Sequence, residues 1–232
     1  MKTQLQIVLL FLLSNYNYAQ QNFVINDGSN KYSVTLSVSK CEDGECSGEG
    51  TVQLFDKKSK ALIQTLASID LFFYLNENQQ PSVNVIQLYD EQSPIQFDDF
   101  NFDGNQDLAI RNGNNGSYNG PSYDVYVFNI TKKQFVISEE LTALASENLG
   151  MFTTDAKTKR ITTFAKSGCC YHITTKYKVV PGKGLVKVIE FEEDASGAED
   201  DIVKVTTRNL IKNKWISKTK KYKIKDYYPN QN

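Results

Sequence analysis

Residues 99–108 read Asp-Phe-Asn-Phe-Asp-Gly-Asn-Gln-Asp-Leu, which places oxygen-bearing side chains at every second residue of a short loop. Calcium takes about six to eight oxygen ligands, so alternating oxygens on a tight loop can surround one ion. Gly104, at loop position 6, allows the sharp turn that other residues resist. The segment therefore predicts a Ca²⁺ site with Asp99, Asn101, Asp103 and Asp107 at positions 1, 3, 5 and 9, and the carbonyl of Asn105 at position 7.

The twelfth position of this loop argues against an EF-hand. Ile110 stands where an EF-hand has a bidentate Glu, and the flanking sequence favours strands over helices. The loop is more similar to the Asp-x-Asp-x-Asp-Gly-x-x-Asp loops of FG-GAP repeats in integrin-type β-propellers, with Asn101 in place of the second Asp. We expect the ion to be structural, because the loop has no catalytic partner.

Four cysteines suggest disulfides in an exported chain. Cys41 and Cys46 bracket Glu-Asp-Gly-Glu, a turn-like sequence, which favours a local bridge at a hairpin tip. Cys169 and Cys170 would then form a vicinal disulfide or stay reduced. The alternative is two long-range bridges from the hairpin to residues 169–170.

Catalytic chemistry has little support in the sequence. Cys170 and His172 share a strand face, but His172 is the only histidine and no group is evident that would orient it. Tetrahedral zinc binding does not suit a vicinal cysteine pair. The chain also lacks a nucleophile-elbow motif and paired Glu residues in a suitable context. We therefore predict a protein that is not an enzyme.

The N-terminus has the features of a secretory signal. Lys2 precedes the apolar run LQIVLLFLL, which is too short to span a bilayer, and Ala19 offers a cleavage site. We predict a signal peptide at 1–19 and a single β domain at 20–232, in the periplasm or secreted, with no transmembrane segment. The net charge of −1 gives no overall electrostatic case for nucleic acid or membrane binding.

Alternating apolar and polar residues predict an all-β protein. We expect an antiparallel sandwich or a propeller-like sheet assembly built from hairpins. One short helix is predicted at 138–147, a flexible Gly/Asn-rich loop at 111–122 and an exposed acidic loop at 192–201. The predicted strands are 32–38, 51–55, 61–66, 69–75, 83–89, 108–110, 123–128, 134–137, 150–154, 160–164, 172–180, 185–191, 202–207 and 214–224.

Lysines alternate with Tyr222 and Ile224 near the C-terminus, as on an ordinary strand face. Lysine also protects an edge strand from pairing with other chains. A solvated edge strand is therefore favoured over a site for nucleic acid or another anionic polymer. The lysines concerned are Lys218, Lys220, Lys221, Lys223 and Lys225.

Two stretches resemble inhibitors of lysozymes. Ser167-Gly168-x-x-Tyr171 matches the Ser-Gly-x-x-Tyr motif of bacterial periplasmic lysozyme inhibitors. Residues 97–135 combine the Asp-rich loop, a Gly/Asn segment and the strand YDVYVFN. This run is similar to the PliI-like inhibitors of invertebrate-type lysozyme and to related immunity proteins against peptidoglycan hydrolases.

The resemblance implies a calcium-stabilised β-protein that inserts a polar and aromatic loop into the cleft of a lysozyme or another peptidoglycan hydrolase. Either 113–123 or 167–171 would be the inserted loop. A calcium-dependent extracellular or cell-surface binding module of FG-GAP type is the alternative, and a secreted hydrolase using the aspartates is a third. The expected partner-binding residues are Ser117, Tyr118, Ser122, Tyr123, Ser167 and Tyr171.

Overall fold

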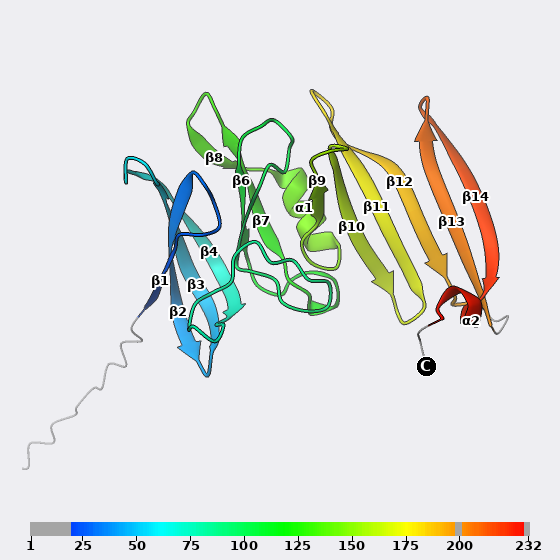
Figure 1. Ribbon diagram of the computed structural model, residues 1–232, viewed down its shortest axis with the longest axis horizontal. Coiled ribbons are helices and arrows are strands. Elements are labelled where there is room, and N and C mark those ends of the chain that lie inside the picture. The colour runs from blue at the N-terminus through cyan, green and yellow to red at the C-terminus, as the bar shows by residue number, and fades with distance from the viewer. Residues whose placement is uncertain (1–19, 198–200, 230–232) are drawn as a thin grey trace, which may run out of the picture.

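Antiparallel strands in three successive sheets make up the protein (Figure 1). The computed structural model describes residues 20–197 and 201–229, and the predicted signal peptide at 1–19 lies outside them. The all-β class is confirmed. The strands are β1 (Gln21–Ile25), β2 (Tyr32–Glu42), β3 (Glu45–Asp56), β4 (Leu62–Tyr74), β5 (Ile95–Asp98), β6 (Asp107–Arg111), β7 (Tyr123–Asn129), β8 (Gln134–Ile137), β9 (Thr153–Asp155), β10 (Arg160–Ser167), β11 (Tyr171–Val180), β12 (Gly184–Asp194), β13 (Ile202–Ile211) and β14 (Lys214–Lys223).

The sheets follow one another in chain order (Figure 1). The first has the order β1-β2-β3-β4, the second β5-β6-β7-β8, and the third β14-β13-β12-β11-β10-β9. The helix α1 (Glu139–Glu147) connects the second sheet to the third, and α2 (Ile224–Tyr227) follows β14. Sequence neighbours pair throughout, which is the hairpin architecture expected from the alternating sequence.

The second sheet is the middle layer, because its strand β6 is buried on both faces. Side chains alternate across a strand. Leu108 and Ile110 accordingly pack into a core shared with the first sheet. Ala109 packs into a second core with Leu141 of α1 and Ile161 of β10. This layering favours the sandwich over the propeller-like assembly.

The third sheet extends away from this core. Its strand β10 contributes the buried Ile161, whereas nearly every residue of the outermost strand β14 is exposed. The predicted edge strand at 214–224 is thus confirmed as β14. Figure 1 shows β13 and β14 at the end of the molecule farthest from the first sheet.

Both pairs of cysteines are joined locally. Cys41 lies opposite Cys46 in the β2–β3 hairpin and is disulfide-bonded to it, which confirms the favoured bridge. Cys169 and Cys170 form a vicinal disulfide at the β10–β11 turn. The long-range alternative is therefore wrong.

Four predicted elements differ from the structure. Residues 83–89 are irregular, because Asn84 and Tyr89 have positive φ and only isolated bridges form there. The strands predicted at 61–66 and 69–75 are one strand, since Ser68 continues the pairing with β3. The acidic loop predicted at 192–201 begins as strand, since β12 continues to Asp194, and residues 198–200 lie outside the described part.

The predicted helix is present as α1, with Ser138 at its N-cap position. One face of α1 packs on the second sheet through Leu141, Leu144 and Ala145. β1 was not predicted, although it pairs with β2 along its whole length. Across the described residues, the helices are all too short or too polar to span a membrane.

Candidate functional site

The predicted calcium loop connects β5 to β6, and its side chains fold back onto its own backbone. Asp99 accepts hydrogen bonds from the N–H groups of Asp103 (2.9 Å) and Gly104 (2.8 Å). Asn101 Oδ1 also accepts from the N–H of Asp103 (2.9 Å), and Asp103 Oδ1 accepts from that of Asn105 (2.7 Å). Gly104 has a φ of 90°, as the predicted sharp turn requires. Such side-chain-to-backbone bonds are typical of Asx turns.

Asp107 ties this loop to the middle sheet. Its buried carboxylate accepts hydrogen bonds from the N–H groups of Phe100 (2.9 Å) and Asn101 (3.3 Å) through Oδ2. Its Oδ1 accepts from the N–H of Phe128 (2.8 Å) on β7. Burial raises the pKa of Asp107 to about 7, although the bond from Phe128 opposes that change.

The donor set has the chemistry of a site for a hard cation, since carboxylate and amide oxygens are the ligands that Ca²⁺ prefers. Within residues 20–197 and 201–229, however, no group of three or more His, Cys, Asp or Glu side chains is arranged so that it could hold a metal ion. Strands flank the loop and Ile110 is buried in the core, unlike an EF-hand. Calcium binding therefore stays a prediction for Asp99, Asn101, Asp103, Asn105 and Asp107.

The loop after β6 was expected to be flexible but is held at both ends. The buried guanidinium of Arg111 donates hydrogen bonds to the carbonyl of Gln92 (3.1 Å) and to the side chain of Asn114. The hydroxyl of Ser117 donates to the carbonyl of Glu147 (3.0 Å) at the end of α1. These contacts fix the path of the loop on the surface of the middle sheet.

Two of the expected partner-binding residues lie in the interior. Ser122 and Tyr123 are both fully buried. The hydroxyl of Tyr123 donates a hydrogen bond to the carbonyl of Ser93 (2.9 Å), and burial raises the pKa of Tyr123. Placing these residues on a partner-binding surface is therefore wrong, because the start of β7 turns them into the core.

Tyr118 is an exposed residue of the same loop, and it contacts the other candidate loop. Tyr118 is 58% exposed, and its backbone has a φ of 58° within the short 3₁₀ turn Ser117–Asn119. Its hydroxyl accepts a hydrogen bond of 2.6 Å from the N–H of Gly168, next to the vicinal disulfide. The two segments expected as alternatives, 113–123 and 167–171, therefore meet in one surface.

Lys166 completes this surface from strand β10. Its ammonium nitrogen lies 4.8 Å from the ring centroid of Tyr118 and 4.8 Å from that of Tyr89. A cation over an aromatic face is attracted by the ring's quadrupole. The ring of Tyr89 also packs edge-on against Phe164. We call Tyr89, Tyr118 and Lys166 the tyrosine–lysine cluster.

A pocket of ≈ 230 Å³ adjoins the cluster. Four separate segments of the chain line it, and they contribute both polar and apolar side chains. Both tyrosines are largely exposed, which leaves their outer ring faces available to a partner. The lining residues are Tyr89, Asp90, Gln92, Tyr118, Gly120, Pro121, Leu149 and Lys166.

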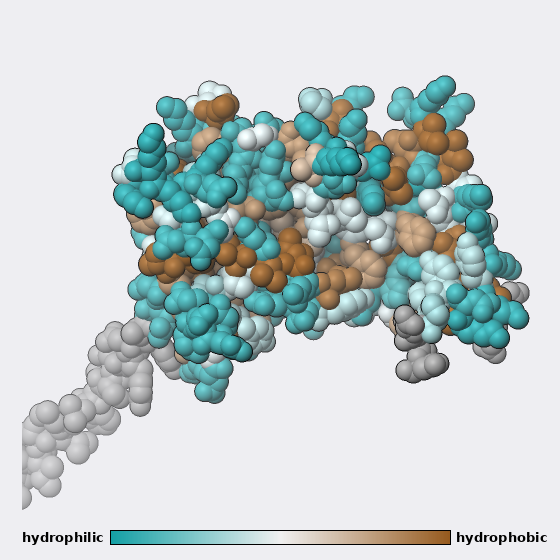
Figure 2. Space-filling view, in the orientation of Figure 1, coloured by the Kyte–Doolittle hydropathy of each residue, from teal (hydrophilic) through white to brown (hydrophobic). Residues whose placement is uncertain are grey.

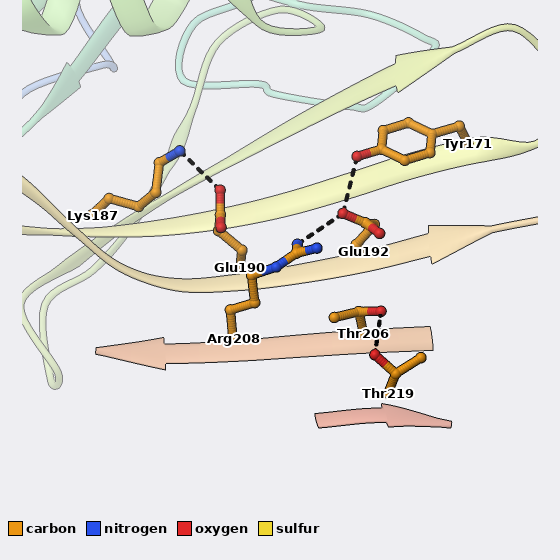
Figure 3. Close-up of polar contacts among 7 residues, drawn as sticks. All are labelled: Tyr171, Lys187, Glu190, Glu192, Thr206, Arg208 and Thr219. Atoms are coloured by element: carbon orange, nitrogen blue, oxygen red, sulfur yellow. Dashed lines mark hydrogen bonds and ion pairs between the residues drawn. The ribbon is translucent and has the colours of Figure 1, made fainter. Parts of the chain in front are cut away.

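Tyr171 points away from this cluster. Ser167 and Tyr171 pair across β10 and β11, and their neighbours Lys166 and His172 pair on the opposite sheet face. The Tyr171 hydroxyl donates a hydrogen bond to Glu192 (3.1 Å), and proximity to this carboxylate adds to the burial that raises the pKa of Tyr171 (Figure 3).

The same oxygen of Glu192 accepts a hydrogen bond from Arg208 (2.8 Å). Figure 3 shows these groups in a polar row across β11, β12 and β13, with Lys187 and Glu190 beside it. Glu192 is mostly buried on this sheet face and therefore fixes the orientation of the Tyr171 ring. The motif tyrosine is thus part of the sheet rather than of the exposed tyrosine–lysine cluster.

Sequence reasoning missed Tyr89 and Lys166. Tyr89 lay in a predicted strand, whereas its positive φ belongs to a turn. Lys166 lies beyond the predicted strand 160–164, whereas β10 extends to Ser167 and brings the Lys166 ammonium over the ring of Tyr89. The spacing of residues contains no signal for either, because their contacts join segments far apart in the chain.

The groups considered for catalysis are engaged elsewhere. His172 stacks on Phe164, with ring centroids 5.7 Å apart. Cys169 and Cys170 are bonded to each other, so neither offers the thiol that a Cys–His nucleophile requires.

Comparison with known proteins identifies a fold but no family. No family model matches the chain, and no curated protein matches it in sequence. A solved structure described as a Xanthomonas Type IV secretion system related protein is similar, with a TM-score of 0.62 and 19% sequence identity. The similarity covers 87% of this chain and 98% of that one, so it extends over all three sheets. At this identity it shows a shared fold and nothing about activity.

Proposed function

We propose that this protein is an exported inhibitor of lysozyme-type peptidoglycan hydrolases, and that it blocks the enzyme's cleft with the tyrosine–lysine cluster. The observation that supports this most is the hydrogen bond from Gly168 to Tyr118. It joins the two segments that resemble inhibitory loops into one exposed surface. The similar solved structure is described as related to a secretion system, which is compatible with an exported role.

The chemistry of the cluster suits a cleft that binds sugars. Tyrosine presents an apolar face and a hydroxyl, so Tyr89 and Tyr118 can pack where sugar rings stack and still form hydrogen bonds. Glycoside hydrolases commonly place two carboxyl groups beside the scissile bond. The ammonium of Lys166 supplies a complementary charge, and the two rings hold it in place.

Calcium has a structural role in this proposal. The predicted ligands Asp99, Asn101, Asp103, Asn105 and Asp107 precede β6, and the loop with Tyr118 follows it. An ion would order the loop at one end of β6, and Asp107 would pass that order to β7 through Phe128. Calcium would therefore strengthen inhibition without contacting the target.

A muramidase inhibition panel tests the proposal. The purified protein is mixed with c-, g- and i-type lysozymes and with muramidases of the source organism, with calcium and with a chelator. We expect inhibition of at least one enzyme at a 1:1 ratio, and weaker inhibition in the chelator.

Each other outcome of the panel points to a different class of protein. Absence of inhibition across the panel, together with calcium binding, would favour a calcium-dependent binding module for a glycan or protein. Turnover of cell-wall substrate by the protein alone would favour a hydrolase. Either result would reject the inhibitor proposal.

A further inference from the structure

The charge of the protein is divided sharply along its length. Residues 20–197 carry 16 Lys and Arg against 23 Asp and Glu, a net charge of −7. Residues 201–229 carry nine Lys and Arg against two Asp, a net charge of +7. The near-neutral total therefore conceals a strongly basic β13–β14 hairpin at the far edge of the third sheet (Figure 1).

The turn of this hairpin is tight and carries lysine. Ile211 and Lys214 form the last pair, so Lys212 and Asn213 are the two turn residues. Both have positive φ, 49° and 60°, as a type I′ hairpin turn requires. We call residues 210–216 the hairpin tip.

Large apolar side chains are exposed at this tip. Ile211, Trp215 and Ile216 are between 45% and 53% exposed, and Trp215 is the only tryptophan of the chain. Figure 2 shows hydrophobic residues at the upper end of the third sheet, with hydrophilic residues around them. Tryptophan and lysine side chains are both typical of the boundary between lipid and water.

The apolar residues lie on both faces of the tip. Trp215 pairs with Leu210 and Ile216 pairs with Asn209, so these neighbours point to opposite sides of the hairpin. A flat protein partner could cover only one of these sides. A lipid interface surrounds an inserted tip and covers both, while the lysines beside it remain at the level of the headgroups.

The hairpin tip and the tyrosine–lysine cluster lie at opposite ends of the third sheet. Successive antiparallel strands place the 167–171 turn at one end and the 211–214 turn at the other. Figure 1 shows these turns at the lower and upper margins of the sheet. A protein held by its hairpin tip would therefore keep the tyrosine–lysine cluster free.

We propose that the hairpin tip anchors the protein peripherally to membranes that contain anionic phospholipids. Trp215, Ile211 and Ile216 enter the interfacial region, and Lys212, Lys214 and Lys218 contact the lipid phosphates. Each lysine near such a surface contributes about a fivefold gain in binding. This surface is independent of the proposed inhibitory function.

Vesicle binding of the purified protein tests the proposal. Vesicles of phosphatidylcholine alone are compared with vesicles containing 30% phosphatidylglycerol by sedimentation, in low and high salt. We expect binding only to the anionic vesicles, and its loss in high salt because screening weakens the lysine contacts. We also expect a blue shift of the fluorescence of Trp215, which reports directly on the tip.

Matched variants separate the tip from charge in general. Lys212→Gln, Lys214→Gln and Lys218→Gln combined should weaken vesicle binding at least tenfold. The control combines Lys58→Gln, Lys60→Gln and Lys132→Gln. These three lysines lie in exposed turns of the other sheets, and Lys60 has a positive φ like Lys212. It should leave binding within twofold.

Ile211→Ser combined with Ile216→Ser keeps Trp215 as the fluorescent reporter and should reduce its blue shift on vesicle binding.

Three results would overturn the proposal. They are equal binding to both kinds of vesicle or to neither, vesicle binding with an unchanged Trp215 spectrum, and equal weakening by the control variant. If duplex DNA at the same phosphate concentration bound as tightly as the anionic vesicles, the surface would be a general polyanion site, and the proposal would also fail.

Discussion

The hydroxyl of Tyr118 accepts a hydrogen bond of 2.6 Å from the backbone N–H of Gly168, which lies 50 residues further along the chain. This contact joins the loop that follows β6 to the β10–β11 turn. It brings Lys166 beneath the Tyr118 ring, opposite Tyr89. Two segments that would be separate candidates on their own thereby form one surface.

Replacing Tyr118 by Phe should loosen this connection without removing the ring. The substitution removes the acceptor for the Gly168 N–H, and a hydrogen bond of this kind contributes about 1 kcal/mol to folding. We expect faster amide exchange at Gly168, measured by NMR, and a fall of about 1 kcal/mol in the free energy of unfolding. Tyr74→Phe is the matched control, since Tyr74 is 56% exposed and lies in β4. Unchanged exchange at Gly168 would contradict the contact.

Calcium should stabilise the protein through the loop between β5 and β6. A ligand at 100 times its dissociation constant adds about 2.7 kcal/mol to the free energy of unfolding. For a protein of this size that corresponds to a rise in Tm of roughly 5–10 °C. Calorimetric titration and thermal unfolding measure the binding and the rise.

Aspartate variants test where that calcium binds. Asp99→Asn or Asp103→Asn should abolish most of the rise in Tm. Asp155→Asn should keep it, because Asp155 forms a similar turn between β9 and β10, where it accepts hydrogen bonds from Thr158 and Lys157. No heat of binding and no rise in the wild type would show that the loop is closed by its own hydrogen bonds alone.

Stability should fall at alkaline pH, partly because of Tyr123. Burial raises the pKa of Tyr123 above the unfolded value of about 10, so the folded state retains its phenolic proton where the unfolded state loses it. Unfolding then releases a proton, and the free energy of unfolding decreases as pH rises above about 10. The Tyr123 contribution is fully present below that pH.

Urea unfolding at several alkaline pH values measures this slope. Tyr123→Phe should reduce it by up to about 1.4 kcal/mol per pH unit. Equal slopes for the wild type and Tyr123→Phe would contradict this account, because they would mean that folding does not raise the pKa of Tyr123.

Strand β6 should be the most sensitive element to truncation. Leu108 is completely buried between the first and second sheets, so Leu108→Ala should cost about 2–5 kcal/mol through lost burial and a residual cavity. Ile130→Ala removes an exposed side chain and should change stability by less than about 0.5 kcal/mol. Urea unfolding compares the two. A small effect of Leu108→Ala would contradict the three-layer packing around β6.

Strand periodicity predicted most of the fold, because a strand with one face in the core shows a clear alternation of apolar and polar residues. Tyr32, Val34 and Leu36 show this pattern and form the core of the first sheet. The prediction of a strand at 83–89 was wrong, since this stretch turns with positive φ at Asn84 and Tyr89 and forms only isolated bridges. Its bridge from Val83 to Ile95 joins residues that are distant in sequence, and the local pattern of residues contains no information about such a contact.

The candidate site was predicted only in part. Tyr118 and Gly168 lie in the expected segments, but their contact depends on how the second and third sheets pack. Ser122 and Tyr123 were expected to bind a partner because they adjoin the polar loop, whereas both side chains are buried and Tyr123 packs into the core from the first position of β7. The opposite net charges of residues 20–197 and 201–229 follow from the sequence alone, but the prediction used only the total net charge, in which they cancel.

Inhibition constants for one muramidase test the central claim most directly. The wild type is compared with Tyr118→Ser, Lys166→Met and the control Tyr74→Ser, after thermal unfolding has shown that each variant folds. We predict that Tyr118→Ser and Lys166→Met each weaken inhibition at least tenfold, and that Tyr74→Ser stays within twofold of the wild type. Equal inhibition by all four proteins, or no inhibition by the wild type, would contradict the assignment of the inhibitory surface to the tyrosine–lysine cluster.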